Sequence, residues 1–330
     1  MVYREKRRTA QCLALMISSV LVAARSPVYS ETFSFVVIAD PHMSGNSDHK
    51  AKFETAVDWI IRNKDRKKIE LTFVLGDIAW GGPRTNRNLH IAKAILDRLH
   101  YADIPYIPII GDNEVQTGCE KEFHEIFASH YQRLSKTLDH WRKSSVPVAD
   151  MYLQNFSFDY KGCHFVCPDF NPRKAGNEGG DLHDFEGGSW RWFMKDIQQC
   201  RKSKKENINI MTHIGMFRTG FKFADQFVFS GEEMNEIKHF LQPYKENVDS
   251  NYAGHLHVNG YVPVWSKLFV PLYHVRITDE TWSGTQWPES EDPGLTVRWV
   301  QVDHSGSKIA YRQTIEDISH RNEISFAYCP

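Results

Sequence analysis

The chain has 330 residues, of which 41% are hydrophobic and 25% are charged, and its formal net charge is −1. This composition is typical of a globular protein with its own core and excludes a disordered or collagen-like chain. The charge balance also argues against a nucleic-acid patch, and we interpret the basic runs at 62–68 and 201–205 as solvated helix ends.

The first 30 residues predict a secretory signal peptide. Four basic side chains between positions 4 and 8 precede an apolar stretch at 12–24 that is short for a membrane span, and Ala24 and Ser30 offer cleavage points. Arg25 and Pro27 interrupt the apolar run, which argues against the alternative of an uncleaved anchor. We therefore expect residues 1–30 to be removed and residues 31–330 to form one domain without a transmembrane helix. The mature protein is expected to be secreted or periplasmic, or endolysosomal in a eukaryote.

Residues 33–110 alternate between apolar runs and helical patterns. The predicted strands are 33–39, 71–75 and 104–110, and apolar positions spaced three and four apart predict helices over 53–61 and 89–99. Such units give parallel strands with right-handed crossovers, whose carboxyl ends meet at one edge of a sheet. Asp40, Asp77 and Asp112 follow the three strands. Because three converging carboxylates repel one another, this edge is predicted to bind cations.

The second half of the chain is predicted to be richer in strands. A helix is expected over 190–200 and a long polar loop over 171–189. One strand delivers His213, and a short run at 251–254 delivers His255 and His257, whose alternate positions point to the same side. The predicted strands are 152–160 and 163–167 as a hairpin with its turn at 160–162, 208–212, and closing antiparallel strands at 268–277, 295–302 and 308–314.

Five motifs in chain order each carry a side chain that binds metals. They are Asp40-Pro41-His42, Gly76-Asp77, Gly111-Asp112-Asn113-Glu114, Thr212-His213 and Gly254-His255-Leu256-His257. Each motif alone is weak, because an aspartate at a strand end often only caps the next helix. The ordered set resembles the calcineurin-like metallophosphoesterases. The resemblance implies an α/β protein, an α/β/β/α sandwich of two mixed β-sheets flanked by helices.

The resemblance also implies a dinuclear metal site. Asp40, His42 and His257 would bind one metal, Asp112, His213 and His255 the other, and Asp77 would bridge the two. A hydroxide that bridges the metals would hydrolyse a phosphomonoester or phosphodiester, with a small-molecule, lipid or nucleotide substrate. In purple acid phosphatases a tyrosine that binds ferric iron stands where this chain has Trp80. Two divalent ions, such as Mn, Zn or Fe(II), are therefore expected.

The third motif departs from the family pattern twice. Asp112 replaces an asparagine ligand, and Asn113 replaces the histidine on the leaving-group side. An amide donates a hydrogen bond but supplies no proton, and general acid catalysis is typically worth about 10²–10⁴-fold. Either the leaving group needs little protonation, or a second histidine, His124 or His183, approaches the site. Alternatively, the protein is catalytically impaired and binds phosphorylated ligands, or Asn113 itself is the ligand in a shifted register.

Two further features concern export and the substrate. Five cysteines follow residue 30, and Cys163 could bridge to Cys167 only across a turn. We interpret the glycosylation sequon at 155–157 as a chance occurrence.

Most aromatic residues after His213 are predicted to lie in the core, whereas Trp80 and Phe217 are predicted to form a substrate wall beside the metals.

Overall fold

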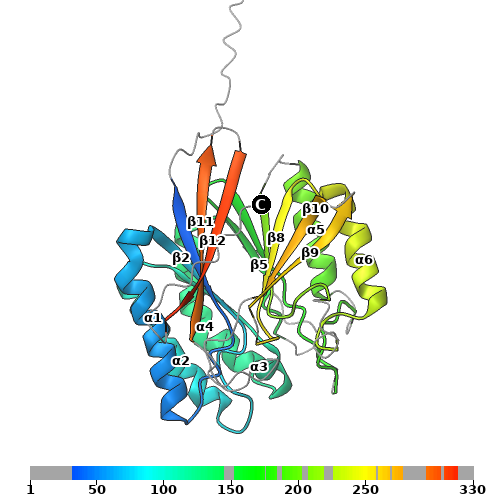
Figure 1. Cartoon of the computed structure of the whole chain (residues 1–330). Coiled ribbons are helices and arrows are strands. Elements are labelled where there is room, and N and C mark those ends of the chain that lie inside the picture. Colours follow the sequence, from blue (N-terminus) through cyan, green and yellow to red (C-terminus); the bar gives the residue numbers. More distant parts are fainter. Residues whose placement is uncertain are drawn as a thin grey trace, which may run out of the picture.

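The fold contains two β-sheets packed face to face with helices outside each. The computed structural model describes residues 32–144, 152–174, 176–183, 188–202, 207–218, 226–257, 259–267, 270–277, 295–305 and 308–318. Figure 1 shows α1 and α2 outside the first sheet and α5 and α6 outside the second. The predicted α/β/β/α sandwich of two mixed sheets is therefore confirmed. The predicted signal peptide and Cys329 lie outside the described residues.

The first sheet contains five strands in the order β12-β11-β1-β2-β3. Strands β1, β2 and β3 are parallel, with β3 at one edge of the sheet, and β11 pairs antiparallel with β1. Every residue of β1 is buried, as expected for a strand covered on both faces. The predicted alternation of strands and helices is confirmed: β1 (Phe33–Ile38), α1 (Ser47–Lys67), β2 (Ile69–Leu75), α2 (Thr85–Tyr101) and β3 (Tyr106–Ile109), with β11 (Thr296–Ser305) and β12 (Lys308–Asp317) completing the sheet.

The second sheet contains seven strands in the order β4-β5-β6-β7-β8-β10-β9. The predicted hairpin is confirmed, because Lys161 (φ 42°) and Gly162 (φ 81°) adopt the left-handed conformations of a two-residue turn. The prediction that the strand at 268–277 is antiparallel is wrong in part, since β10 is antiparallel to β9 but parallel to β8. The strands are β4 (Asp139–Lys143), β5 (Phe156–Tyr160), β6 (Cys163–Cys167), β7 (Ile208–Met211), β8 (Val248–Ala253), β9 (Gly260–Lys267) and β10 (Val270–Ile277).

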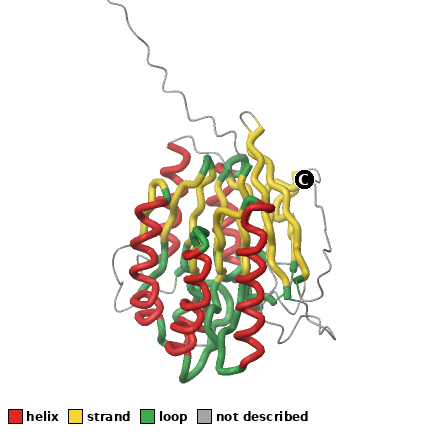
Figure 2. The backbone as a smooth tube through the Cα atoms, turned by 90° about the vertical axis from the view of Figure 1, so that its left-hand side faces the viewer, coloured by secondary structure: helices red, strands yellow, loops and turns green. Residues whose placement is uncertain are grey.

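Four further helices complete the layers. Figure 2 looks onto the helices outside the first sheet, with the strands behind them and loops gathered at the lower end. The four further helices are α3 (Asp112–Gln116), α4 (Glu120–Thr137), α5 (Ser189–Lys202) and α6 (Gly231–Leu241), the last followed by a short 3₁₀ helix (Gln242–Tyr244). Helix α6 begins with a capping box: the Ser230 hydroxyl accepts from the Glu233 N–H at 3.3 Å, and the Glu233 carboxylate accepts from the Ser230 N–H at 3.1 Å.

Aromatic side chains join the two sheets. The Phe35 ring of the first sheet makes edge-to-face contacts with Phe165 and Tyr252 of the second, each with ring centroids 5.6 Å apart. Such contacts fix the facing of the sheets and so the relative position of their strand ends. No helix of the described residues is both long enough and apolar enough to cross a bilayer.

The structure also bears on the sequon and the cysteines. Asn155 is 1% exposed and its side-chain oxygen accepts from the Asp169 N–H at 2.8 Å, so the folded protein presents no acceptor at this sequon. Cys163 and Cys167 stand at the two ends of the extended strand β6, which excludes a bridge between them. Both are free thiols, as are Cys119 and Cys200.

Candidate metal centre

The seven predicted metal ligands lie together at the carboxyl ends of the parallel strands. They fall into three overlapping groups, in each of which one ligand atom per residue lies within 4.8 Å of the others. The groups are Asp40 with His42 and His257, Asp112 with His213 and His255, and Asp40 with Asp77 and His213. Their proximity is a structural finding, whereas their role as ligands stays a prediction.

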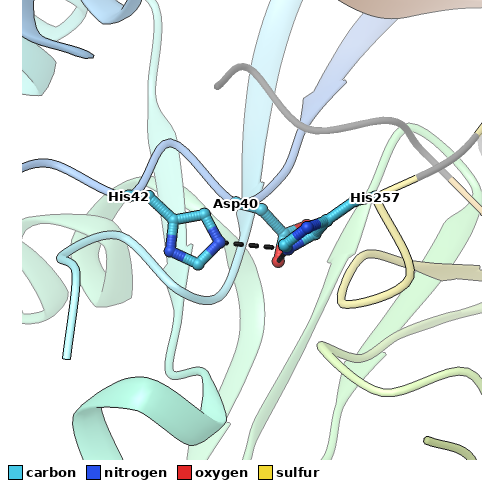
Figure 3. Close-up of side chains that lie close together, drawn as sticks. All are labelled: Asp40, His42 and His257. Atoms are coloured by element: carbon cyan, nitrogen blue, oxygen red, sulfur yellow. Dashed lines mark hydrogen bonds and ion pairs between the residues drawn. The ribbon is translucent and has the colours of Figure 1, made fainter. Parts of the chain in front are cut away.

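The first group joins the end of β1 to the segment after β8 (Figure 3). The Nε2 atoms of His42 and His257 lie 3.1 Å apart, and a carboxylate oxygen of Asp40 lies 3.7 Å from His257 Nε2. Burial lowers the pKa of His42 well below its usual value, and burial together with His255 lowers the pKa of His257 to about 3. Both imidazoles are therefore neutral, the form that binds metals.

The second group joins β7, α3 and the segment after β8. Oδ1 of Asp112 lies 2.8 Å from His213 Nε2 and 3.2 Å from His255 Nδ1. The opposite nitrogen of each ring faces a backbone carbonyl: His213 Nδ1 is 2.8 Å from the oxygen of Leu75, and His255 Nε2 is 3.0 Å from that of Glu178. Hydrogen bonds to such carbonyls orient metal-binding histidines and leave the other nitrogen toward the site.

Asp77 lies between the two groups. Its carboxylate is 3.3 Å from His213 and 3.8 Å from His42, so it lies beside one residue of each group. Burial raises the pKa of Asp40 to about 6, and burial and the charge of Asp112 raise the pKa of Asp77 well above its usual value. His213, whose own pKa these aspartates raise, compensates their burial only in part. The donor set of carboxylate oxygens and imidazole nitrogens fits two divalent cations.

The backbone bends sharply at these positions. Five of the seven residues have left-handed φ angles, which are uncommon outside glycine and cost on the order of 1–3 kcal/mol each: Asp40 (49°), His42 (42°), Asp77 (46°), His255 (67°) and His257 (50°). Glycines make the close packing feasible. A Cβ on Gly76 would lie 2.4 Å from His213 Nδ1, and one on Gly254 would lie 2.5 Å from an Asp40 oxygen. Strain concentrated in one cluster is typical of a functional site.

The motif Gly111-Asp112-Asn113-Glu114 holds the motif Gly76-Asp77 in place by hydrogen bonds. The backbone N–H of Asn113 donates to Asp77 Oδ1 at 3.0 Å, and its side-chain amide donates to Asp77 Oδ2. The amide oxygen of Asn113 accepts from the Gly81 N–H at 3.2 Å. Asn113 therefore orients Asp77, a contact that the sequence did not predict. Because Asp112 faces both histidines of its group, the geometry favours Asp112 over Asn113 as the ligand.

Glu114 is a buried residue of the motif to which the sequence assigned no role. Its carboxylate accepts from the N–H groups of Ala79 and Gly111, each at 2.8 Å, and so ties the loop after β2 to the start of α3. Burial raises its pKa to about 7. The spacing of a glutamate three residues after Gly111 is that of one half of a capping box, since Gly111 has no side chain to make the other half, and this spacing is the sequence signal for the contact.

A cavity of about 220 Å³ opens onto the cluster. Trp80 lines it as predicted, with its ring 4.9 Å from that of His42 and 43% of its surface exposed. The prediction for Phe217 is wrong: its ring is 2% exposed and packs in the core between the second sheet and its helices. Phe227 lines the cavity instead, 5.9 Å from His255.

The two histidines considered as proton donors lie elsewhere. His124 contacts Gln154 and Tyr152, and His183 pairs with Glu236 at 2.7 Å on the surface. Neither lines the cavity over the cluster. Each histidine is held by partners from distant parts of the chain, which the local sequence does not reveal. The prediction that one of them approaches the site is therefore wrong.

The comparisons with known proteins agree with this geometry. Residues 33–259 match the sequence model of the family described as "Calcineurin-like phosphoesterase". Similar solved structures include a dimetal phosphatase from Danio rerio (14% identity, TM-score 0.57, 90% of this chain and 99% of that one). Another is the purple acid phosphatase PPD1 from yellow lupin seeds (13% identity, TM-score 0.57, 90% of this chain and 53% of that one).

A third similar structure is GAP50, the anchor in the inner membrane complex of Plasmodium (8% identity, TM-score 0.52, 90% of this chain and 88% of that one). No curated protein sequence matches the chain. At these identities the solved structures show a shared fold, whereas the sequence model spans more than half of the chain. The chain belongs to the calcineurin-like phosphoesterase family.

Proposed function

We propose that the protein hydrolyses a phosphomonoester or phosphodiester with the help of two divalent metal ions (Mn, Zn or Fe). The observation that carries the proposal is the convergence of seven oxygen- and nitrogen-bearing side chains at one edge of the fold. Asp40, His42 and His257 would hold one ion, Asp112, His213 and His255 the other, and Asp77 both. When bound, the two ions supply a nucleophilic hydroxide at neutral pH and neutralise charge on the phosphoryl oxygens.

The protein's own residues orient this site and shape its entrance. Asn113 holds both oxygens of Asp77, and Trp80 and Phe227 form the aromatic walls of the cavity. Since the amide of Asn113 is already engaged with Asp77 and Gly81, it serves as a positioning residue. With His124 and His183 placed elsewhere, the geometry supports a substrate whose leaving group departs without much protonation.

The first experiment measures metal content and turnover on the purified protein. We expect two ions per chain, and metal-dependent hydrolysis of p-nitrophenyl phosphate or bis(p-nitrophenyl) phosphate. Phenyl phosphate, a poorer leaving group, should react far more slowly. The Asn113→His variant should narrow the difference between the two aryl phosphates if proton transfer limits the rate. Equal rates for both aryl phosphates in the natural protein would contradict our account of the leaving group.

The alternative is a catalytically impaired metal-containing protein that binds phosphorylated ligands. The replacement of the family histidine by Asn113 favours it, and GAP50, named as an anchor, shares the fold, which therefore does not by itself imply catalysis. Two bound ions and phosphate binding without turnover of any ester in a broad panel would support this alternative.

We further propose that the protein is exported. The support is the basic and apolar pattern of residues 1–30. N-terminal sequencing of the mature protein from the extracytoplasmic or lysosomal fraction tests this, with cleavage expected after Ala24 or Ser30. A protein recovered intact in the cytosol would overturn it.

A further inference from the structure

Gln116, the last residue of α3, lines the cavity over the predicted metal centre but belongs to none of the ligand groups. Its side-chain Nε2 donates to Asp112 Oδ2 at 3.0 Å. The two residues are four apart, so one helical turn places both side chains on the same face. The amide of Gln116 is therefore a direct neighbour of a predicted metal ligand.

The two oxygens of Asp112 face different partners. Oδ1 lies 2.8 Å from His213 Nε2 and 3.2 Å from His255 Nδ1. Oδ2 accepts the hydrogen bond from Gln116. The two oxygens of an ionised carboxylate are chemically equivalent, so either could bind a cation or both could bind it together. The hydrogen bond from Gln116 distinguishes them, because it engages one oxygen and leaves the other beside the two histidines.

Asp77 is held in a different way. Its Oδ1 lies 3.3 Å from His213 and its Oδ2 lies 3.8 Å from His42, so each oxygen faces a different group. Asn113 donates to both of them, from the backbone N–H to Oδ1 and from the side-chain amide to Oδ2. Helix α3 thus carries one side-chain amide for each of two carboxylates. The carboxylate between the groups keeps both oxygens toward the cluster, whereas Asp112 needs only one there.

The contact also explains how an aspartate works where the family pattern has an asparagine ligand. An asparagine side chain has a single oxygen, so its chemistry defines the atom that binds a cation. Asp112 has two, and one of them needs a hydrogen-bond donor if the other alone is to bind the cation. Gln116 supplies that donor. Removal of a partner that orients a metal ligand typically lowers metal affinity roughly 10–100-fold.

We propose that Gln116 is a positioning residue that limits Asp112 to one metal-facing oxygen and so strengthens binding of the ion in the group that contains Asp112. The inference rests on the metal binding in the proposed function and adds a residue outside the seven predicted ligands. Because the side chain of Gln116 is exposed, its replacement should leave the fold intact.

The test is a titration of the metal-free protein with Co²⁺, whose visible absorption depends on its coordination. Gln116→Met keeps the length of the side chain and removes the donor. The dissociation constant of one ion should rise about tenfold, and that of the other should stay the same. With Asp112 Oδ2 released, the coordination number of the weakened ion should rise and its absorption should fall. Gln132→Met, at an exposed glutamine of α4, is the matched control and should leave both ions unchanged.

Variants of single ligands assign the effect to one position. His42→Ala should leave the ion in the group that contains Asp112, and adding Gln116→Met should weaken it. His255→Ala should leave the other ion, and adding Gln116→Met should have no effect on it. The urea midpoint of the metal-free protein should be the same with and without Gln116→Met. Gln116→Ala should reproduce the loss of affinity.

These measurements separate failure of this inference from failure of the proposed function. If Gln116→Met bound two ions as tightly as the natural chain, the inference would be overturned and the proposed function would stand. An equal loss at both positions would also overturn it, since the variant would then have loosened the whole site. Two bound ions without turnover of any ester would overturn the hydrolysis, whereas the affinities and spectra would still decide the role of Gln116. A chain that takes up no divalent ion would overturn both.

Discussion

Two clusters of titratable side chains use the same residue types and balance their charge in opposite ways. The first is the predicted metal centre. The second, which we call the His164 cluster, comprises His164, Asp159, Asp196, Arg142 and Cys200. His164 donates from Nδ1 to Asp159 at 2.6 Å and from Nε2 to Asp196 at 2.8 Å, and Arg142 lies 3.2 Å from Asp196. Although burial opposes the charge, these two aspartates raise the pKa of His164 to about 10.

The difference shows why residue type alone does not define a metal site. His164, Asp196 and Cys200 offer ligand atoms within 4.8 Å of one another, as the metal centre's groups do. Both nitrogens of His164 hold protons directed at carboxylates, so the ring has no lone pair for a metal. At the predicted metal centre, by contrast, burial keeps His42 neutral, and His213 offsets the burial of Asp40 and Asp77 only in part, since the pKa values of both carboxyl groups stay raised. The predicted metal centre thus has carboxylates whose charge the protein does not fully balance, whereas the His164 cluster is neutralised by the protein itself.

The largest expected effect is that of Asp77→Ala. Because Asp77 contacts residues of both ligand groups, its loss should reduce bound metal below two ions per chain. Hydrolysis should fall by about 10³-fold or more, the equivalent of several kcal/mol of transition-state stabilisation. Elemental analysis and steady-state rates measure both. Asp65→Ala, at an exposed aspartate of α1, is the control and should keep full metal content. Full metal content in Asp77→Ala would contradict a bridging role.

The next effect is on stability. His164→Ala removes the counter-charge that Asp159 and Asp196 share, and because Arg142 and His140 remain beside them, the free energy of unfolding should fall by about 3 kcal/mol, the lower end for breaking a buried pair. Urea denaturation measures this change. Metal content should stay at two ions per chain, in contrast to Asp77→Ala. The loss of one bound ion would mean instead that the His164 cluster holds a metal, and the contrast between the clusters would fail.

The pH dependence of stability sharpens the same contrast. The folded-state pKa of His164, about 10, lies above its unfolded value of 6.5. Its contribution is therefore fully present below pH 6.5 and is lost as the pH rises through 10. The facing groups are Asp159 on β5, Asp196 and Cys200 on α5, and Arg142 on β4; in addition, His140 of β4 pairs with Asp159 at 2.7 Å.

His164→Gln isolates this contribution, because the amide still donates a hydrogen bond but does not titrate. The difference in unfolding free energy between the natural chain and His164→Gln should shrink from pH 6.5 to pH 10. A constant difference over that range would show that His164 is neutral in the folded protein.

The sequence predicted those parts of the fold and site that depend on local pattern. Strands β1 and β2 are largely apolar runs, and each predicted ligand lies two to four residues beyond the end of a strand. Helix α4 was missed although Phe123, Phe127, Tyr131 and Leu134 repeat at helical spacing, interrupted by the buried polar His130. Strands β4 and β9 were also missed. Their patterns are short, and pairing within the sheet defines them.

The details within the site depend on packing between distant segments. Phe227 rather than Phe217 lines the cavity, a difference that spacing along the chain does not encode. The contact of Asn113 with Asp77 joins α3 to the loop after β2, and the partners of His164 come from two elements, β5 and α5. A local pattern names the ligand-type residues, but their protonation follows from neighbours brought in by the fold.

The smallest expected effect concerns the entrance to the metal centre rather than its charge. Trp80 lines the cavity beside His42 without belonging to either ligand group. Trp80→Ala should raise the KM for an aryl phosphate about 3–10-fold, the usual worth of an aromatic contact, and leave metal content and the urea midpoint nearly unchanged. Trp80→Phe should restore most of the affinity. If kcat and metal content fell together instead, Trp80 would serve to position His42, and the entrance would be part of the metal centre that it borders.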